Sequence, residues 1–477
     1  MPSPYLFAAN PATRAARNVH GKVSRKGVIP VGRRIQPNAL AASVALALLA
    51  ATGSVHAISL AEAYTAALGH DPQFRAAQAQ TEAGREALPQ AVARLRPNIS
   101  LSSQRYRIEQ ERTDGGQQFP KQDYPSDSTV LSIRQPLLNL RLAANRDQAK
   151  ASVASGEAAL SLEQQALANR LVTAYSNLAL GYEQLAVVEL QQRSNAARLS
   201  AARRALEAGT GIRTDIDEIQ AQTDLLEAQQ LQAKQSIQAA QAELEEITGQ
   251  PVTKAIRLQD NKALLQASQK LDPGALGNWL EKINTVNPEL LARRAQVEAA
   301  QAASRASRAD HLPTLELIAQ TSKSSSENSF FVDSKTETQA IGVQLNLPLY
   351  QGGFLQSRDR QTAAELRAAE ELVSRTQTTA RIEASKAFYA LKEGIARVAA
   401  LEKAVESANQ VVVANQKSFT AGLRSTLDIL SAEQRAAQTQ LELRQAQLQL
   451  LVNHVRLQGL VGQADAPVFD ELSSWFQ

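Results

Sequence analysis

The chain has 477 residues, of which 44% are hydrophobic and 21% are charged, and it contains no cysteine. The lack of cysteine excludes a disulfide framework, thiolate metal sites and an acylated cysteine. Seven of the 51 basic residues and none of the 47 acidic ones lie in residues 1–37. The rest of the chain is therefore mildly acidic, and its composition gives no support for nucleic-acid binding.

A secretory signal peptide is predicted over residues 1–57. The basic segment is followed by an apolar run at residues 39–51 and then by Val55-His56-Ala57, which has small residues at the cleavage-site positions. Cleavage is expected after Ala57. A retained membrane anchor is the alternative, but the apolar run is shorter than the roughly 20 residues that a spanning helix needs.

The remaining chain shows internal similarity at a long offset. Gly209 and Gly422 lie 213 residues apart, and each interrupts a long stretch without proline. Asp71-Pro72 corresponds to Asn287-Pro288 at a similar offset of 216 residues. This period is too long for a solenoid. The sequence therefore predicts two repeats, residues 58–270 and 271–477, in a pseudo-symmetric body.

Four segments have the pattern of strands, at about 98–108, 128–135, 315–321 and 338–347. The last shows it best, because Ile341, Val343 and Leu345 alternate with polar or small residues. Such lengths are enough to cross a membrane when the strands are tilted. A soluble hairpin is the alternative; the predicted export and the long polar loops favour a membrane barrel with a wet interior.

Long helices are predicted to follow the strands in each repeat. Residues 140–208 contain no proline and only two glycines, and they are rich in alanine, glutamine and leucine. A helix of this length extends roughly 100 Å. Residues 213–247 run back from it, and residues 356–420 and 425–460 repeat the pair. Helices this long normally pack as coiled coils.

These features resemble the TolC family of trimeric outer-membrane export ducts. The most specific matches are HLPTLEL at residues 311–317 and LNLPLYQGG at 345–353, supported by TAY at 173–175 and EITG at 246–249. The resemblance implies a mixed α and β fold. Three protomers would share a 12-stranded barrel in the outer membrane, with four strands from each, above a long periplasmic α-helical barrel. Residues 250–286 and the C-terminal segment would form a belt around that helical barrel.

The resemblance also assigns the helix turns to the periplasmic tip of the duct. Gly209, Gly211 and Gly422 would form the turns, at about 209–215 and 419–428. A latch that holds the entrance shut would consist of four residues, namely Thr214, Asp215, Phe419 and Arg424. The family often has tyrosine where this chain has Phe419, so the latch bond made by that hydroxyl is expected to be absent.

Asp428 is the residue expected to narrow the pore, as one of three symmetry-related carboxylates. Ser431 stands where a second acidic ring would lie in relatives with two rings. Without the resemblance, Asp428 reads as a helix cap, because Ser425-x-x-Asp428 and Thr214-x-x-Asp217 both look like helix starts. A single residue can fill both roles, so the pore role and the capping role are compatible.

The sequence gives little basis for catalysis or for a bound metal or cofactor. His70, His311 and His454 stand in unrelated contexts and make no metal-ligand spacing. His311 precedes Leu312-Pro313 at an expected helix-to-strand corner, which favours a structural role. A coiled-coil surface adhesin and a secreted enzyme are the alternatives from other functional classes.

Within the duct interpretation, the absence of an acylated cysteine resembles the type I secretion branch of the family. The duct would then work with a periplasmic adaptor protein and an inner-membrane ABC transporter, which supplies the energy. The expected cargo is a protein toxin of the repeat (RTX) type, such as an adenylate cyclase–haemolysin. The outer-membrane channel of a multidrug efflux pump is the alternative.

Overall fold

The computed structural model describes residues 58–252, 254–327 and 334–477. The predicted signal peptide, residues 1–57, lies outside these ranges. Three short helices open the described chain: α2 (Leu60–His70), α3 (Pro72–Arg85) and α4 (Ala87–Ala93). Ser59 and Glu62 form a capping box at α2, and Asp71 accepts a hydrogen bond from the Phe74 amide at the start of α3.

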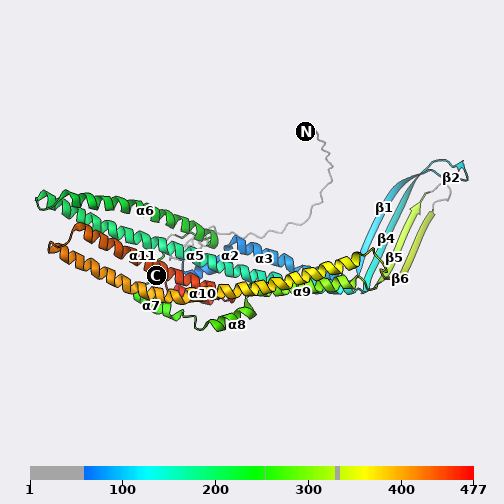
Figure 1. Cartoon of the computed structure of the whole chain (residues 1–477). Coiled ribbons are helices and arrows are strands. Elements are labelled where there is room, and N and C mark those ends of the chain that lie inside the picture. Colours follow the sequence, from blue (N-terminus) through cyan, green and yellow to red (C-terminus); the bar gives the residue numbers. More distant parts are fainter. Residues whose placement is uncertain (1–57, 253, 328–333) are drawn as a thin grey trace, which may run out of the picture. The chain divides into compact units, whose positions relative to one another are not determined.

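Four long antiparallel strands form one sheet. They are β1 (Asn98–Gln110), β4 (Gln122–Leu138), β5 (Thr314–Ser326) and β6 (Ser334–Asn346), in the order β1-β4-β5-β6. A short hairpin, β2 (Thr113–Asp114) and β3 (Gln117–Gln118), lies between β1 and β4. Each expected strand range overlaps one of the four long strands, but the observed strands have 13, 17, 13 and 13 residues and are longer than expected. The β4–β5 pairing joins two hairpins that lie far apart in the sequence (Figure 1).

The two faces of this sheet differ in chemistry. Side chains alternate between faces along each strand, so the register places Ile99, Ile133, Ala319 and Ile341 side by side in one row. Of the ten charged residues on the four strands, eight lie on this apolar face, beyond its apolar part. Only Arg134 and Glu316 lie on the opposite face, which is otherwise rich in serine, threonine and glutamine.

Two helical hairpins extend from the sheet. The first consists of α5 (Leu140–Glu207) and α6 (Arg213–Thr248), with 68 and 36 residues. The second consists of α10 (Phe354–Thr420) and α11 (Thr426–Leu460), with 67 and 35 residues. The Asn139 side chain caps α5 by accepting the Leu142 amide at 3.0 Å. Within each hairpin the two helices lie side by side (Figure 1).

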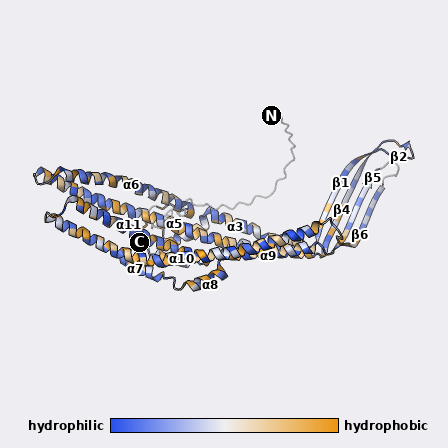
Figure 2. Cartoon of the chain, viewed as in Figure 1, coloured by the Kyte–Doolittle hydropathy of each residue, from blue (hydrophilic) through white to orange (hydrophobic). Residues whose placement is uncertain are grey.

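Shorter helices complete the structure: α7 (Asn261–Lys270), α8 (Leu276–Val286), α9 (Pro288–Ala309) and α12 (Ala466–Ser473). Helix α9 packs along both α5 and α10 before the chain enters β5. Hydrophilic and hydrophobic residues intermingle along the long helices (Figure 2). No helix within the described ranges is both long and apolar enough to cross a membrane.

The largest core lies where α2, the middle of α5, the end of α6 and the C-terminal segment meet. Tyr64 stacks on Phe469 with a ring-centroid distance of 4.2 Å, and the Tyr175 hydroxyl donates to the Ile58 carbonyl at 3.0 Å. Segment 250–286, which was expected to share a belt with the C-terminal segment, contacts it at Leu258, which forms a β-bridge with Phe476. Trp475 is buried there.

The corner between α9 and β5 is held by His311. Its Nε2 lies 2.9 Å from Asp359 Oδ2, and Ser307 Oγ donates to Asp359 Oδ1 at 2.6 Å. These bonds, mainly the one from Ser307, hold the pKa of Asp359 below its usual value. His311 therefore connects the end of α9 to α10, just before the chain enters β5, which fits the structural role expected for it.

Candidate functional site

The turn between α5 and α6 depends on two glycines. Gly209 has a φ of 73°, a conformation that side chains with a Cβ rarely adopt. The Gly211 amide donates to the Ala205 carbonyl at 2.9 Å, which folds the loop back onto the end of α5. A Cβ at Gly211 would lie 2.9 Å from the Leu206 amide nitrogen, so a larger residue would force the backbone apart.

The turn between α10 and α11 has a related geometry. Gly422 has a φ of 72°, and its amide donates to the Phe419 carbonyl at 2.9 Å. The Leu423 amide then donates to the Ser418 carbonyl at 2.9 Å. The carbonyls at the end of α10 are thereby satisfied, as is usual where a left-handed glycine ends a helix.

Asp428 caps the helix that follows this turn. Its Oδ2 accepts the Ser425 amide at 2.9 Å, while Ser425 Oγ accepts the Asp428 amide at 3.2 Å, which completes a capping box. Arg424 Nη1 lies 3.4 Å from Asp428 Oδ1. The hydrogen bonds from Ser425, and then the charge of Arg424, hold the pKa of Asp428 below its usual value. The capping role expected for Asp428 is confirmed.

A helix also begins at the Thr214-x-x-Asp217 pattern, as expected, but Thr214 does not cap it. Helix α6 begins at Arg213, and its N-cap is Ile212, which makes no side-chain capping bond. Thr214 therefore lies inside the first turn, where it is exposed. Arg213 and Asp217 are 3.9 Å apart and form an exposed ion pair on this turn. The connection between α5 and α6 therefore relies on backbone hydrogen bonds, whereas α11, after the connection from α10, begins with a side-chain cap.

The structure brings part of the expected latch together. Asp215 and Phe419, from different hairpins, line one cavity of about 480 Å³ between the two turns. Phe419 is 43% exposed. Arg424 pairs with Asp428 on its own turn, and within the described part of the chain no hydrogen bond joins it to Thr214. Ser431 lies half-buried on α11, one turn beyond Asp428.

One contact near the turns was not anticipated from the sequence. Arg198 on α5 forms an ion pair with Glu433 on α11, and both side chains are only 21% exposed. Gln416 on α10 donates to Glu433 at 3.4 Å. Arg198 and Gln416 line the same cavity as Asp215. Arg198 and Glu433 are 235 residues apart, so no local spacing connects them.

The three histidines of the described chain do not form a common site. His454 is buried on α11, and this burial lowers its pKa to about 4. Within residues 58–252, 254–327 and 334–477, no group of three or more histidine, aspartate or glutamate side chains could hold a metal ion.

Comparisons with known proteins agree with the fold. The family model described as outer membrane efflux protein matches residues 63–250 and 279–463. The solved structure of CusC superposes with a TM-score of 0.73 at 17% identity, covering 84% of this chain and 92% of that one. At this identity the likeness shows the fold.

Curated relatives match over most of their length. The proteases secretion protein PrtF of Dickeya chrysanthemi is 30% identical, covering 89% of this chain and 92% of that protein. The alkaline protease secretion protein AprF of Pseudomonas aeruginosa is 32% identical, covering 86% and 85%. Protein CyaE of Bordetella pertussis is 26% identical, covering 81% and 82%. The chain therefore belongs to the outer membrane efflux protein family, which the resemblance to TolC ducts had predicted.

Proposed function

We propose that this protein is the outer-membrane duct of a tripartite secretion system, through which a protein cargo leaves the cell. The observation that carries the proposal is the two-faced sheet, which continues directly into two long helical hairpins. An apolar face suits lipid and a polar face suits a water-filled passage. A partner protein would supply the energy for transport.

The open edges of the sheet support the proposed homotrimer. β1 and β6 are its two edge strands in the described chain. A sheet edge cannot face hydrocarbon, because its backbone groups would have no hydrogen-bond partners. Pairing β6 of one protomer with β1 of the next closes a barrel, and three protomers give 12 strands. The two proposed repeats are supported by hairpins of nearly equal length, with 68 and 36 residues against 67 and 35.

The helix turns are proposed as the periplasmic entrance. Thr214, Asp215, Phe419 and Arg424 would close it as a latch, and Asp428 with Ser431 would form the narrowest part of the assembled pore. The cavity shared by Asp215 and Phe419 supports this, because the two hairpins already meet there. A periplasmic adaptor protein and an inner-membrane ABC transporter would dock at this end.

The polar face of the sheet supports a protein as cargo. It carries only Arg134 and Glu316 as charged residues, and these have opposite signs. A neutral hydroxyl- and amide-rich wall neither attracts nor repels a polypeptide of either net charge. Relatives at 30% and 32% identity are named for the secretion of proteases. A secreted protease is therefore an alternative to the expected toxin.

Gene deletion in the producing bacterium tests the function. We expect loss of the protein from the outer membrane to retain one or a few proteins inside the cell that are otherwise found in the medium, as measured by mass spectrometry. Resistance to small toxic compounds should change little. The opposite pattern, with normal secretion and increased drug sensitivity, would support a multidrug efflux channel instead.

A further inference from the structure

The apolar face of the sheet ends abruptly in charged residues. Ile99, Ile133, Ala319 and Ile341 form one row across the four strands, and the next row contains Leu101 and Leu131 beside Thr321 and Gln339. The row after that is Ser103, Thr129, Lys323 and Glu337, and it is followed by Arg105, Asp127, Ser325 and Lys335. The change from apolar to charged therefore occurs within two rows.

Successive rows on one face lie roughly 7 Å apart along a strand. The charged rows thus begin where hydrocarbon gives way to headgroups if the apolar rows contact lipid tails. These rows lie at the strand ends opposite to the long helices. In the orientation proposed above, this end of the sheet lies at the outer leaflet.

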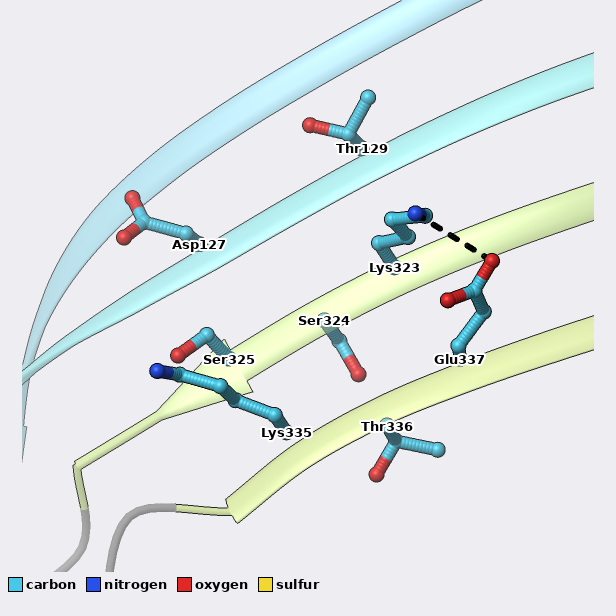
Figure 3. A pocket seen from close by; sticks show the side chains of 8 residues that line it. All are labelled: Asp127, Thr129, Lys323, Ser324, Ser325, Lys335, Thr336 and Glu337. Carbon is cyan, nitrogen blue, oxygen red and sulfur yellow. Dashed lines mark ion pairs between the residues drawn. The ribbon is translucent and has the colours of Figure 1, made fainter.

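The two charged rows form a recognisable surface feature. Figure 3 shows the Lys323 and Glu337 side chains, which are 3.3 Å apart, with Lys335 and Ser325 in the neighbouring row. Together with Asp127 and Thr129 they line a surface pocket of about 430 Å³. Three basic residues and two acidic ones occupy the two rows, so the feature has a net positive charge.

Arg105 and Lys323 keep hydrogen-bond donors for a ligand. Arg105 is 78% exposed although it lies 3.4 Å from Asp127, and Lys323 is 69% exposed although it pairs with Glu337. A guanidinium has five N–H donors and an ammonium has three, so one carboxylate leaves several of them available. Each carboxylate therefore takes up only part of the hydrogen-bonding capacity of its basic partner.

We propose that these two rows bind the phosphate groups of an anionic lipid in the outer leaflet, whose acyl chains lie on the apolar rows beside them. Charge complementarity supports a phosphate, and continuity with the apolar rows supports a lipid rather than a soluble anion. The proposal rests on the membrane orientation of the proposed function, but it concerns the outer wall of the barrel and not the duct.

Thermal unfolding of the detergent-purified full-length protein tests the proposal. We expect bisphosphorylated lipid A to raise the unfolding midpoint more than lipid A whose phosphates have been removed, since a ligand of the folded state stabilises it. A variant with Arg105→Gln, Lys323→Gln and Lys335→Gln should bind the phosphorylated lipid about tenfold more weakly, because it loses charge-assisted hydrogen bonds.

A matched control uses the opposite face of the same sheet. Arg134→Gln removes one positive charge there and should keep the full preference for phosphorylated lipid. A variant that retains the charges (Arg105→Lys, Lys323→Arg and Lys335→Arg) should keep it too, even if the glutamine variant folds poorly. Equal stabilisation by both lipids, an equal loss in Arg134→Gln, or an equal effect of inorganic phosphate alone would each overturn the proposal.

Single-channel recording on the same preparations separates this proposal from the proposed duct. Unchanged conductance in the glutamine variant, together with loss of the lipid preference, supports lipid binding at an intact channel. A preparation that prefers phosphorylated lipid but does not conduct would leave the lipid site standing and count against the duct.

Discussion

Arg198 on α5 and Glu433 on α11 form an ion pair between the two helical hairpins, close to both turns. The pair is only 21% exposed on each side, and Gln416 adds a hydrogen bond to Glu433. Because the partners belong to different hairpins, the pair is lost when the hairpins move apart at their turns. It connects them more firmly than the exposed pairs on the turns do.

Arg198→Ala is expected to loosen this end of the protein. Removing the guanidinium leaves a mostly buried carboxylate without its charged partner, which costs about 1–3 kcal/mol. If the turns close the duct, the single-channel conductance in planar bilayers rises. Arg213→Ala is the control, because its pair with Asp217 is exposed and is worth about 0.5 kcal/mol or less. Equal conductance in Arg198→Ala and wild type would place the closure elsewhere.

Arg424→Ala tests the latch that the family resemblance implies. In the chain Arg424 pairs with Asp428, not with Thr214, so the loss of its charge is expected to raise conductance only modestly. Adding Thr214→Ala should change little further, because Thr214 is exposed. A large extra increase in the double variant would mean that the two residues meet across protomers in the assembled protein.

Asp428→Asn tests whether the capping carboxylate also faces the pore. Three symmetry-related carboxylates at a constriction favour cations, so the wild-type channel should be cation-selective and be blocked by multivalent cations from the turn end. Asparagine removes the charge, and its side-chain oxygen can still accept the hydrogen bond from the Ser425 amide. Reversal potentials in a salt gradient measure the outcome, and an unshifted value in the mutant would remove Asp428 from the pore.

Lowering the pH adds a second test of Asp428. Within one chain, bonds from Ser425 and Arg424 lower its pKa, so its stabilising contribution is present above the ordinary value of 3.8 and is lost as pH falls through the lower folded value. Three close carboxylates in a ring would raise the pKa instead. Loss of cation block well above pH 4 would therefore support a ring of coupled carboxylates, whereas block that persists below pH 4 would mean that the three carboxylates do not raise one another's pKa.

Local signals in the sequence predicted the helices, strands and turns. They could not predict contacts between segments that lie far apart in the chain. Glycine at 209 and 422 marked both turns, because positive φ leaves a clear residue preference. The capping pattern at Thr214 marked the start of a helix but not its cap, because the N-cap is Ile212, which makes no side-chain capping bond. The Arg198–Glu433 pair gave no signal, because it depends on how two hairpins pack and not on either segment alone.

Gly249 is expected to tolerate no side chain. It ends α6 with a φ of 69°, and a Cβ there would lie 2.4 Å from the ring of His70 on α2. Gly249→Ala should lower the free energy of unfolding by about 2–4 kcal/mol, from backbone strain and overpacking together. Gly156→Ala is the matched control: it lies within α5 with no atom within 4 Å of an added Cβ, so it should stabilise by about 0.5–1 kcal/mol. Chemical denaturation of both variants decides the point, and equal stability would refute it.

Finally, His454 should make the fold sensitive to mild acid. It is buried on α11, both ring nitrogens lack a hydrogen-bond partner within the described chain, and burial lowers its pKa from 6.5 to about 4. Between these values the unfolded chain binds a proton that the folded chain does not, so stability falls as pH drops from 6.5 towards 4, by up to about 3 kcal/mol per chain.

His454→Leu removes this titration while filling a similar volume. We expect its unfolding midpoint to change less between pH 7 and pH 5 than that of the wild type, and to exceed it at pH 5. His311→Asn is the control, because His311 pairs with Asp359 near the sheet and its loss should leave the acid sensitivity in place. An equally steep fall in His454→Leu would show that another group is responsible for the acid sensitivity.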